Sequence, residues 1–322
     1  MSYFKLSWKN YPLTLKQPFT ISRGSKEIVN NVLVELRKDG VVGYGEAGPN
    51  KRYDEDADKV RDYLQTIPED FFADIQSVEE LVARLDKHSQ TVSPIRSAQA
   101  AVEMAWLDWL GKSRGQPLWK MWNAPKSTGP VTSYTIGLDD LDVMQQKVKK
   151  AADFPIYKVK LGTSRDREII HALREVTDKL IRVDANEGWT SLSKAREMID
   201  FLSDKNIELV EQPMPAAQVD NLKILKQNAP LPICADESFL GDESVKETAE
   251  AFDIINIKLM KTGSLYKAKN IIDRARELDL KVMIGCMIES SVANAAGALL
   301  SLWADYCDLD GHLLIKNDPA GG

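Results

Sequence analysis

The chain has 322 residues and a mass of 36.1 kDa, enough for a barrel of roughly 200 to 250 residues together with a domain of roughly 100. Its 42 Lys and Arg face 48 Asp and Glu, giving a net charge of −6 without any basic block, so we expect no nucleic-acid partner. No apolar run reaches the roughly 18 residues of a membrane span and the first ten residues are too polar for a signal peptide, so we expect a cytoplasmic protein with no membrane partner.

Residues 3–46 alternate apolar and polar side chains as strands do. Alternate residues from Val32 to Leu36 share one apolar face, and Asp39 and Gly40 form a typical hairpin turn before the next run. We therefore predict a small antiparallel sheet. The exposed turn between its first two strands carries Arg23, which is either a solvated surface residue or a contact to a substrate.

The next segment has helical periodicity, with three predicted helices over 54–65, 77–88 and 93–112. The third is the most apolar. Its stripe of Ala and Trp, which ends in Trp106 and Trp109, resembles an aromatic ligand box, but such stripes are far more often core packing. We interpret it as core.

From residue 131 onward, short apolar runs alternate with helical patterns over 165–178, 192–203, 264–278 and 290–303. Five of the runs end in charges spaced 24, 27, 25 and 22 residues apart, about one strand, one helix and two loops each. The predicted strands are 131–137, the runs that end near Lys160, Asp184, Glu211, Asp236 and Lys258, then 282–286 and the region of 308–310. Eight such units predict an α/β protein with a TIM-type (β/α) barrel. The sequence shows no clear eighth helix before it ends.

Asp184, Glu211 and Asp236 stand at equivalent ends of successive predicted strands. Because the carboxyl ends of parallel barrel strands meet at one mouth, their side chains should point at a common volume. Crowded carboxylates repel each other unless a cation joins them, and ligation by oxygen alone favours Mg²⁺, with Mn²⁺ or Ca²⁺ as alternatives. The competing interpretation, three separate surface ion pairs, is disfavoured by the threefold repetition.

Lysines flank these carboxylates. Lys158 and Lys160 lie two residues apart and so share one strand face, while Lys258 lies almost across the barrel. Neighbouring ammonium groups and a divalent cation would lower the pKa of a lysine towards working pH, so that it can act as a base. Lys160 and Lys258 are then suited to remove a proton from one face of a carbon and return it from the other. A metal on an adjacent carboxylate would stabilise the resulting enediolate, and Lys158 is placed to contact that carboxylate.

The remaining motifs carry little chemistry. The three cysteines are widely spaced without a CxxC pair, which indicates reduced thiols in a core. The three histidines have no metal-ligand spacing, and no glycine-rich phosphate loop occurs.

Together these motifs strongly resemble the muconate-lactonizing-enzyme subgroup of the enolase superfamily. The resemblance rests on Lys158-Val159-Lys160, Asp184-Ala185-Asn186, Glu211-Gln212-Pro213, Ala235-Asp236-Glu237-Ser238 and Asn256-Ile257-Lys258-Leu259-Met260-Lys261. Sites with Lys or His bases and Mg²⁺ are known for this superfamily. The resemblance covers nearly the whole chain, and Ala100 to Trp122 is similar to a helix and turn of the family's capping domain.

Within that subgroup, Asp308-Leu309-Asp310 resembles the Asp-x-Asp motif with which dipeptide epimerases hold an α-ammonium group. Residues 285–291 are similar to the segment after the seventh strand of the same enzymes. The resemblance therefore implies a Mg²⁺-dependent isomerase that inverts the α-carbon of the C-terminal residue of L-Ala-L-X dipeptides by a two-base 1,1-proton transfer. Ala-Glu from cell-wall peptide is the family's best-known substrate.

The resemblance also implies an enolase-like α+β capping domain over 1–125 and a catalytic barrel over 126–322. One Mg²⁺ per subunit, for which Mn²⁺ is a substitute, would be bound by Asp184, Glu211 and Asp236, with Lys160 and Lys258 as acid/base catalysts. The implied substrate-binding residues are Arg23, Thr135, Lys158, Cys286, Asp308 and Asp310.

Two departures from the family leave questions open. The family continues past the eighth strand into a segment that returns to the capping domain, and this segment is apparently missing here. The loop around Arg23 does not align cleanly with enzymes that bind a C-terminal glutamate, so the preferred second residue stays open, as do the stereoisomer served by each lysine and homo-oligomerisation. The alternatives are o-succinylbenzoate synthase or muconate cycloisomerase-like chemistry, whose substrates lack an α-ammonium, and a non-catalytic barrel.

Overall fold

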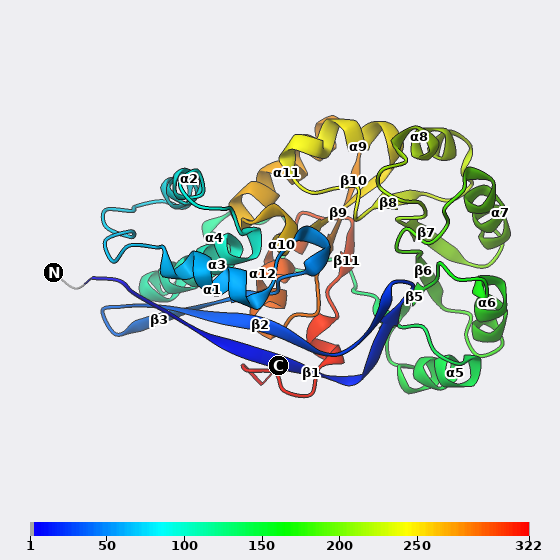
Figure 1. Cartoon of the computed structure of the whole chain (residues 1–322), viewed down its shortest axis with the longest axis horizontal. Helices are drawn as coiled ribbons and strands as arrows, with labels where there is room; N and C mark the ends of the chain where they lie inside the picture. The colour runs from blue at the N-terminus through cyan, green and yellow to red at the C-terminus, as the bar shows by residue number, and fades with distance from the viewer. Residues whose placement is uncertain (1–2, 322) are drawn as a thin grey trace.

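The computed structural model describes residues 3–321; Met1, Ser2 and Gly322, the outermost residues of the two predicted domains, lie outside it. An N-terminal sheet with its helices and a barrel lie next to each other along the long axis of the molecule (Figure 1). This is the predicted fold class. No helix in the described range is both long enough and apolar enough to cross a bilayer.

The N-terminal sheet is antiparallel, in the order β1-β2-β3. Its strands are β1 (Lys5–Ile21), β2 (Gly24–Lys38) and β3 (Val41–Ala47). The predicted apolar face is confirmed, since Val32, Val34 and Leu36 are fully buried. Beyond the N-terminal domain, β1 and β2 continue as a two-stranded ribbon that reaches the barrel (Figure 1).

Helices cover the buried face of this sheet. Those of the N-terminal domain that contact it are α1 (Ala57–Gln65) and α3 (Arg96–Arg114), while α2 (Val78–His88) and α4 (Leu118–Met121) pack on α3 and η1 (Lys51–Tyr53) lies at the cavity by the barrel mouth. The apolar helix α3 lies so close to β3 that a Cβ at Gly43 would come within 1.9 Å of the Ala105 carbonyl oxygen. Only glycine permits this approach. Trp106 is 1% exposed, which confirms the aromatic stripe as core.

Eight parallel strands form the barrel, in the same order as in the sequence. They are β4 (Tyr134–Ile136), β5 (Ile156–Lys160), β6 (Leu180–Asp184), β7 (Ile207–Glu211), β8 (Ile233–Ala235), β9 (Ile254–Lys258), β10 (Lys281–Gly285) and β11 (Tyr306–Asp308). Thr132, two residues before β4, forms a parallel bridge with Cys307 of β11, and this bridge joins the first barrel strand to the last. The sheet is therefore nearly closed, as predicted.

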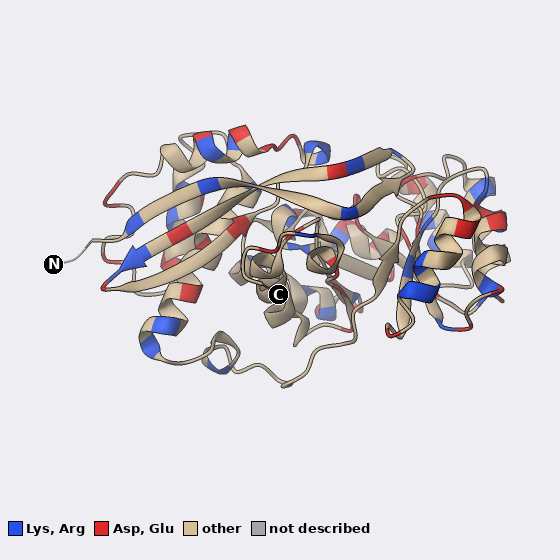
Figure 2. Cartoon of the chain, turned by 90° about the horizontal axis from the view of Figure 1, so that it is seen from below, with Lys and Arg blue, Asp and Glu red and all other residues tan. Residues whose placement is uncertain are grey.

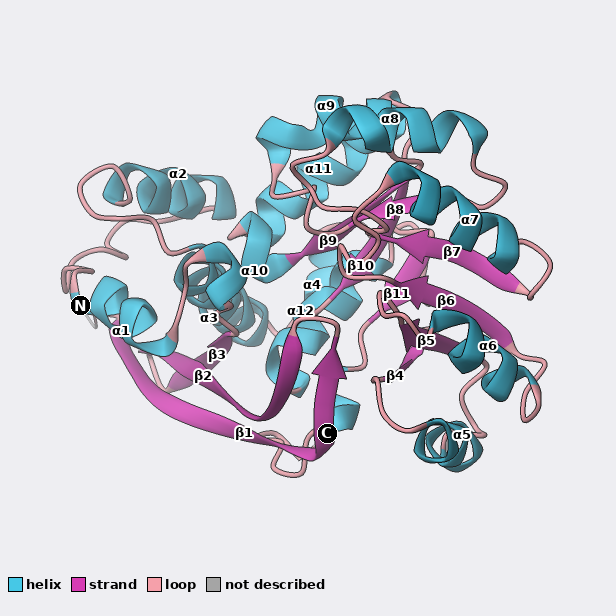
Figure 3. Ribbon diagram, turned by 45° about the vertical axis from the view of Figure 1, so that its right-hand side comes forward, coloured by secondary structure: helices cyan, strands magenta, loops and turns pink. Residues whose placement is uncertain are grey.

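The barrel helices form an outer layer around the strands (Figure 3). They are α5 (Leu141–Lys150), α6 (Asp166–Arg174), α7 (Leu192–Leu202), α8 (Val219–Asn228), η2 (Asp242–Ser244), α9 (Val245–Ala251), α10 (Leu259–Thr262), α11 (Leu265–Glu277) and α12 (Ser291–Ser301). A short 3₁₀ helix, η3 (Gly311–Leu314), follows the last strand in place of an eighth α-helix.

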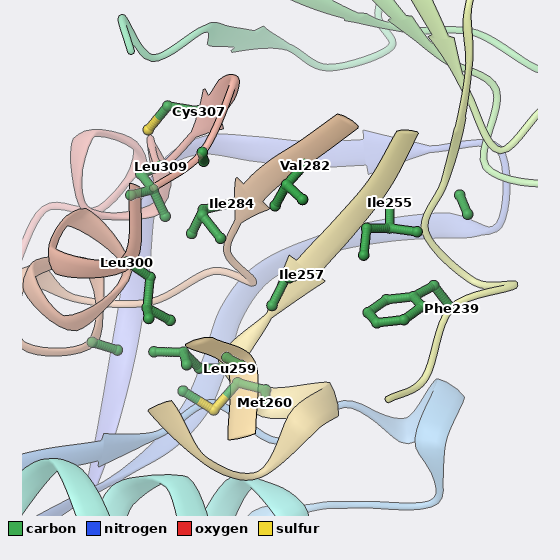
Figure 4. Packing of buried hydrophobic residues seen from close by; sticks show 14 of the residues in the cluster. Phe239, Ile255, Ile257, Leu259, Met260, Val282, Ile284, Leu300, Cys307 and Leu309 are labelled. Atoms are coloured by element: carbon green, nitrogen blue, oxygen red, sulfur yellow. The ribbon is translucent and has the colours of Figure 1, made fainter. Parts of the chain in front are cut away.

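The barrel interior changes from apolar to charged along the strands. Because side chains alternate on a strand, Ile255 and Ile257 of β9 pack outward with residues of β10 and the helices (Figure 4). Ile254, Asn256 and Lys258 share the other face, in that order towards the carboxyl end. A fully buried cluster of Leu209, Cys234, Ile254 and Met283 fills the bottom of the barrel. This apolar floor supports the charged layer above it.

The cysteines are unpaired, as predicted, but they are not all core residues. Cys234 and Cys307 are buried, whereas Cys286 is only partly buried. Cys286 lies just after β10, at the end of the barrel where the charged residues gather.

The end of the described chain returns to the N-terminal sheet, which differs from our expectation of a missing return segment. Ile315 forms an antiparallel bridge with Leu15 of β1. The Lys316 amide donates to the Thr14 carbonyl oxygen at 2.8 Å, and the Thr14 amide donates to Asn317 Oδ1 at 2.8 Å. The pairing involves only residues 315–317. A segment of three residues is too short to show strand periodicity in the sequence.

Candidate active site

The carboxyl ends of the barrel strands bring most of the predicted site residues together. Six of them stand in the last residues of a strand: Thr135 on β4, Lys158 and Lys160 on β5, Asp184 on β6, Glu211 on β7 and Lys258 on β9. Four more lie at or just after a strand end: Asp236 after β8, Cys286 after β10, and Asp308 and Asp310 at and after the end of β11. Elsewhere both signs of charge are spread over the ribbon and the outer helices (Figure 2). The charges in the mouth differ because they are buried.

Lys158 lies at the centre of the buried charges, with only 3% of its side chain exposed. Its Nζ lies 2.7 Å from Glu211 Oε2, 2.7 Å from Asp308 Oδ2 and 3.1 Å from Asp184 Oδ2. One ammonium group therefore joins carboxylates from three strands. In the structure this ammonium group holds the residues of the mouth together, and the contact of Lys158 with a substrate carboxylate stays a prediction.

The other two lysines occupy opposite sides of the mouth. Lys160 Nζ on β5 lies 2.6 Å from Asp184 Oδ2, and Lys258 Nζ on β9 lies 2.8 Å from Asp236 Oδ2. Three strands, β6 to β8, separate β5 from β9 in the barrel. Each predicted acid/base lysine is thus paired with one predicted metal ligand.

The contacts within the mouth raise the pKa values of Lys158 and Lys258. Burial by itself lowers the pKa of Lys258, but Asp236 and Glu211 raise it well above its ordinary value. The pKa of Lys158 is likewise raised, since the carboxylates of Asp308, Glu211 and Asp184 outweigh burial. The expected lowering assumed a divalent cation among the carboxylates, whereas here the lysines contact the carboxylates directly.

Asp184, Glu211 and Asp236 repel each other, as the sequence predicted. Burial raises the pKa of Glu211 to about 7, and the charges of Asp184 and Asp236 act in the same direction against Lys158. For Asp184 the lysine charges outweigh burial and lower the pKa. The three carboxylates are thus close enough to interact, and the lysine ammonium groups that contact them offset their mutual repulsion.

The donor chemistry of these carboxylates fits a hard divalent cation. Within residues 3–321, no three acidic, Cys or His side chains converge on a single point, because each of these carboxylates is turned towards a lysine. The Lys158 ammonium lies within 3.1 Å of both Asp184 and Glu211, so a positive charge already occupies the position between them. Oxygen-only ligands that already surround a positive charge suit Mg²⁺.

The acidic pair after the eighth strand has two different environments. Asp308 Oδ1 accepts from Ser133 Oγ at 2.6 Å and its Oδ2 accepts from Lys158. Asp310 Oδ2 accepts from the Thr135 amide at 2.6 Å, and no ion pair to Asp310 occurs in the described structure. Burial and the neighbouring Asp308 raise the pKa of Asp310 to about 6. Asp310 is therefore the carboxylate of this pair that lacks a cation.

Arg23 belongs to the capping ribbon, and its guanidinium contacts the barrel. Nη1 donates to the Asn186 carbonyl oxygen at 2.9 Å and to Glu187 Oε2 at 3.0 Å, and Nη2 donates to Glu237 Oε1 at 2.6 Å. On the ribbon's other side, the Leu138 amide donates to the Thr20 carbonyl oxygen at 2.9 Å. Arg23 thus fastens the ribbon over the mouth, and its contact with a substrate stays a prediction.

Sequence reasoning missed two residues that support the site. Lys261 is 1% exposed, and its Nζ contacts Asp236 Oδ1 at 2.8 Å, the Asp236 carbonyl oxygen at 2.7 Å and the Asn256 carbonyl oxygen at 3.0 Å. Asn256 in turn donates from Nδ2 to Glu211 Oε1 at 3.0 Å. The signal was present in the sequence: Lys261 is the second lysine of the last quoted motif, and Asn256 shares the strand face of Lys258.

The ribbon and the mouth enclose a cavity of about 520 Å³. Predicted residues that line it are Arg23, Thr135, Lys158, Lys160, Asp236, Lys258, Cys286, Asp308 and Asp310; Asp184 and Glu211 lie beneath them. The Cys286 thiol is close to the Asp308 carbonyl oxygen, at 3.4 Å. A larger cavity, about 1250 Å³, lies between α3 and α12, away from these charges.

A nearly closed parallel barrel with acidic residues and lysines at its mouth, covered by an N-terminal α+β domain, defines an enolase-type protein. Residues 142–314 match the family model described as enolase C-terminal domain-like, and residues 7–122 match that of the mandelate racemase/muconate lactonizing enzyme N-terminal domain. The chain is therefore a member of the mandelate racemase/muconate lactonizing enzyme group of the enolase superfamily.

Its relatives narrow the comparison to enzymes of one kind. An L-Ala-D/L-Glu epimerase from Bacteroides thetaiotaomicron is 40% identical over 99% of this chain and 82% of its own length. An L-Ala-D/L-amino acid epimerase from Pedosphaera parvula is 37% identical over 97% of this chain and 91% of its own. A dipeptide epimerase from Enterococcus faecalis, solved with Mg and the dipeptide L-Leu-L-Tyr, superposes with a TM-score of 0.90 at 30% identity, covering 99% of this chain and 93% of that one.

Proposed function

We propose that this protein is a Mg²⁺-dependent dipeptide epimerase that inverts the α-carbon of the C-terminal residue of L-Ala-L-X dipeptides. The observation that carries the proposal is the placement of Lys160 and Lys258 on opposite sides of one cavity, with an acidic pair at its edge. Relatives named as dipeptide epimerases, one of them with Mg and a dipeptide bound, support it.

Asp184, Glu211 and Asp236 would hold one Mg²⁺ per subunit, and Mn²⁺ would be a substitute. A bound cation supplies electrostatic stabilisation of the negative charge that develops when a proton leaves a carbon next to a carboxylate. The ligands' present lysine partners would then turn from the carboxylates towards the substrate.

The proton transfer itself is assigned to the two paired lysines. Lys160 and Lys258 face the cavity from β5 and β9, so one can take the α-proton from one side while the other supplies a proton to the opposite side. One lysine must be neutral and the other charged for each direction. Because the carboxylates keep Lys258 protonated at neutral pH in this structure, charge on those carboxylates has to be offset before Lys258 acts as a base.

The remaining residues would position the dipeptide. Asp310, buried and without a cation, is suited to bind the α-ammonium group, with Asp308 next to it. Lys158 would contact the substrate carboxylate, while Thr135 and Cys286 line the cavity around the peptide. Arg23 keeps the ribbon closed over the mouth, which limits the access of water.

Hydrogen exchange tests this assignment. The protein is incubated with Mg²⁺ in D₂O and L-Ala-L-X dipeptides, and deuterium at the C-terminal α-carbon is read by mass. The wild type should incorporate deuterium and produce the L,D isomer. Lys160→Ala and Lys258→Ala should each abolish epimerisation, and each should keep exchange with at most one isomer.

A matched control is Lys149→Ala on α5, an exposed lysine outside the mouth, which should behave as the wild type. Exchange of both isomers at the wild-type rate in either active-site variant would refute the two-base assignment. Exchange unchanged by Asp310→Asn would instead favour a substrate without an α-ammonium group.

A further inference from the structure

The main-chain ladder between β7 and β8 ends just before Asp236. The last bond of this ladder runs from the Gln212 amide to the Cys234 carbonyl oxygen, at 2.8 Å. In a regular parallel ladder, the next bond would run from the Asp236 amide to the Gln212 carbonyl oxygen. In this structure that carbonyl oxygen instead accepts from the amide of Glu187, in the loop after β6, at 2.9 Å. The Asp236 amide therefore needs another acceptor.

The side chain of Gln212 supplies this acceptor. Its Oε1 accepts from the Asp236 amide and from the Ser238 amide, both at 3.0 Å. Its Nε2 donates to Ser238 Oγ at 2.8 Å and to the Met214 carbonyl oxygen at 2.9 Å. A primary amide has two donor hydrogens and an oxygen that can accept twice, so every position of this amide is used. Gln212 is fully buried, so water does not replace these bonds.

The backbone of Gln212 is strained. Its φ is 36°, in the left-handed region that residues other than Gly, Asn and Asp rarely adopt. In this conformation its carbonyl group binds the loop after β6, while its side chain binds the segment after β8. One residue therefore joins the ends of three strands, and each of these ends carries one proposed Mg²⁺ ligand: Asp184, Glu211 or Asp236.

Gln212 differs from the two lysines that also hold Asp236. Lys258 Nζ and Lys261 Nζ each lie 2.8 Å from a carboxylate oxygen of Asp236, and these oxygens are the atoms that a bound cation would need as ligands. The Gln212 side chain binds the main-chain amide of Asp236 instead. It can therefore hold this residue in place while both carboxylate oxygens stay free for a metal.

We propose that Gln212 is a positioning residue, which fixes the Glu211 and Asp236 carboxylates relative to each other and thereby makes the site selective for Mg²⁺ over Ca²⁺. The inference rests on the Mg²⁺ site of the proposed function. Gln212 directly follows Glu211 in the chain, and its side chain binds Asp236, so it connects the two ligands through few bonds. Mg²⁺ demands near-ideal geometry at short distances, whereas Ca²⁺ accepts flexible sites with longer ones. Loss of this connection should therefore weaken Mg²⁺ binding more than Ca²⁺ binding.

Calorimetric titration of the EDTA-treated full chain with Mg²⁺ and with Ca²⁺ tests this role without any turnover. Gln212→Met keeps the length of the side chain but removes all four hydrogen bonds. Its Mg²⁺ affinity should fall by about tenfold to a hundredfold, the usual effect of losing a group that orients a metal ligand, and its Ca²⁺ affinity should fall less. The control Gln218→Met removes another hydrogen-bonded amide, which contacts Thr190 and Asn221, and should keep both affinities.

Gln212→Asn separates the reach of the amide from the strain of the backbone, and it keeps the test decisive if Gln212→Met does not fold. Asn adopts a positive φ more readily than Gln, but its amide is one methylene group shorter and loses the bond to the Asp236 amide. It should therefore also lose Mg²⁺ preference, whatever its stability in urea with EDTA. A purely structural role would lower that stability and leave the Mg²⁺/Ca²⁺ affinity ratio unchanged.

Two results would contradict these expectations in different ways. A Mg²⁺/Ca²⁺ affinity ratio equal to that of the wild type in either Gln212 variant would overturn the inference and leave the epimerase assignment intact. A wild type that binds no Mg²⁺ would overturn the Mg²⁺-dependent function and this inference with it.

Discussion

Replacing Lys261 by Met should destabilise the fold and loosen the position of the Asp236 carboxylate, which Lys261 contacts. The ammonium group of Lys261 is buried and lies within 3.0 Å of three oxygens, two of them main-chain carbonyls. Met preserves the length and the apolar stem but removes every donor. The carbonyl groups of Asp236 and Asn256 would lose this contact, and the Asp236 carboxylate would keep only Lys258.

The expected cost follows from this burial. Removing one partner of a buried ion pair costs about 3 to 5 kcal/mol, and the remaining Lys258 contact places Lys261→Met near the lower end of that range. Lys267→Met is the matched control. Its ion pair with Asp86 is 37% and 44% exposed at the two side chains, so its loss should cost only about 0 to 1 kcal/mol.

Urea unfolding with EDTA and with Mg²⁺ measures both effects. With EDTA, Lys261→Met should lower the free energy of unfolding by about 3 kcal/mol with an unchanged m value. The additional stability conferred by Mg²⁺ should also shrink, since Asp236 is less well positioned. If Lys261→Met destabilises the protein no more than Lys267→Met, the support ascribed to Lys261 is wrong.

Two further predictions concern buried carboxylates outside the mouth. Burial raises the pKa of Glu103 from 4.5 to about 7, so the folded state holds this proton more tightly than the unfolded state. The protonated carboxyl therefore contributes its full stabilisation of the fold below pH 4.5, and this stabilisation is lost as the pH rises through 7. The loss amounts to about 3 kcal/mol, and the difference in unfolding free energy between wild type and Glu103→Gln should follow that pH course; a difference independent of pH would contradict it. Glu46 of β3 accepts from Asn31 at 2.8 Å, from the Ser290 amide at 3.0 Å and from the Ala293 amide at 3.2 Å, which attaches the N-terminal domain to the start of α12. Glu46→Gln should cost about 3 kcal/mol in urea unfolding, and a loss as small as that of Glu35→Gln, whose side chain is 26% exposed, would show that these bonds carry little stability.

The strand ends were predictable because βα units repeat at regular intervals. Strands β5, β6, β7 and β9 end at the predicted charges, and β8 ends one residue before Asp236. The register aligns Lys160 with Asp184 and Asp184 with Glu211. A chain that buries its barrel strands on both faces has few places for charges other than the strand ends, so their positions mark the mouth.

The partners of those charges were not predictable from the sequence. Spacing places Lys158 and Asp308 at the same end of the barrel, but 150 residues separate them in the chain. Their contact depends on strand tilt and side-chain rotamers, which periodicity does not encode. Lys261 was missed for a related reason: the one-turn helix α10 directly after β9 turns it back under Asp236.

The contacts made by the ribbon side chains could not be predicted from the sequence. The sequence draws attention to Arg23 because it stands on the turn, yet its side chain binds the barrel, and Lys26 is the ribbon cation that lines the cavity without an acidic partner. The barrel residues assigned to the chemistry stand on strands whose register is fixed by burial, whereas the ribbon has a register shift between Thr14 and Phe19. Changes in the ribbon can therefore alter the wall of the cavity without disturbing the lysines and carboxylates below it.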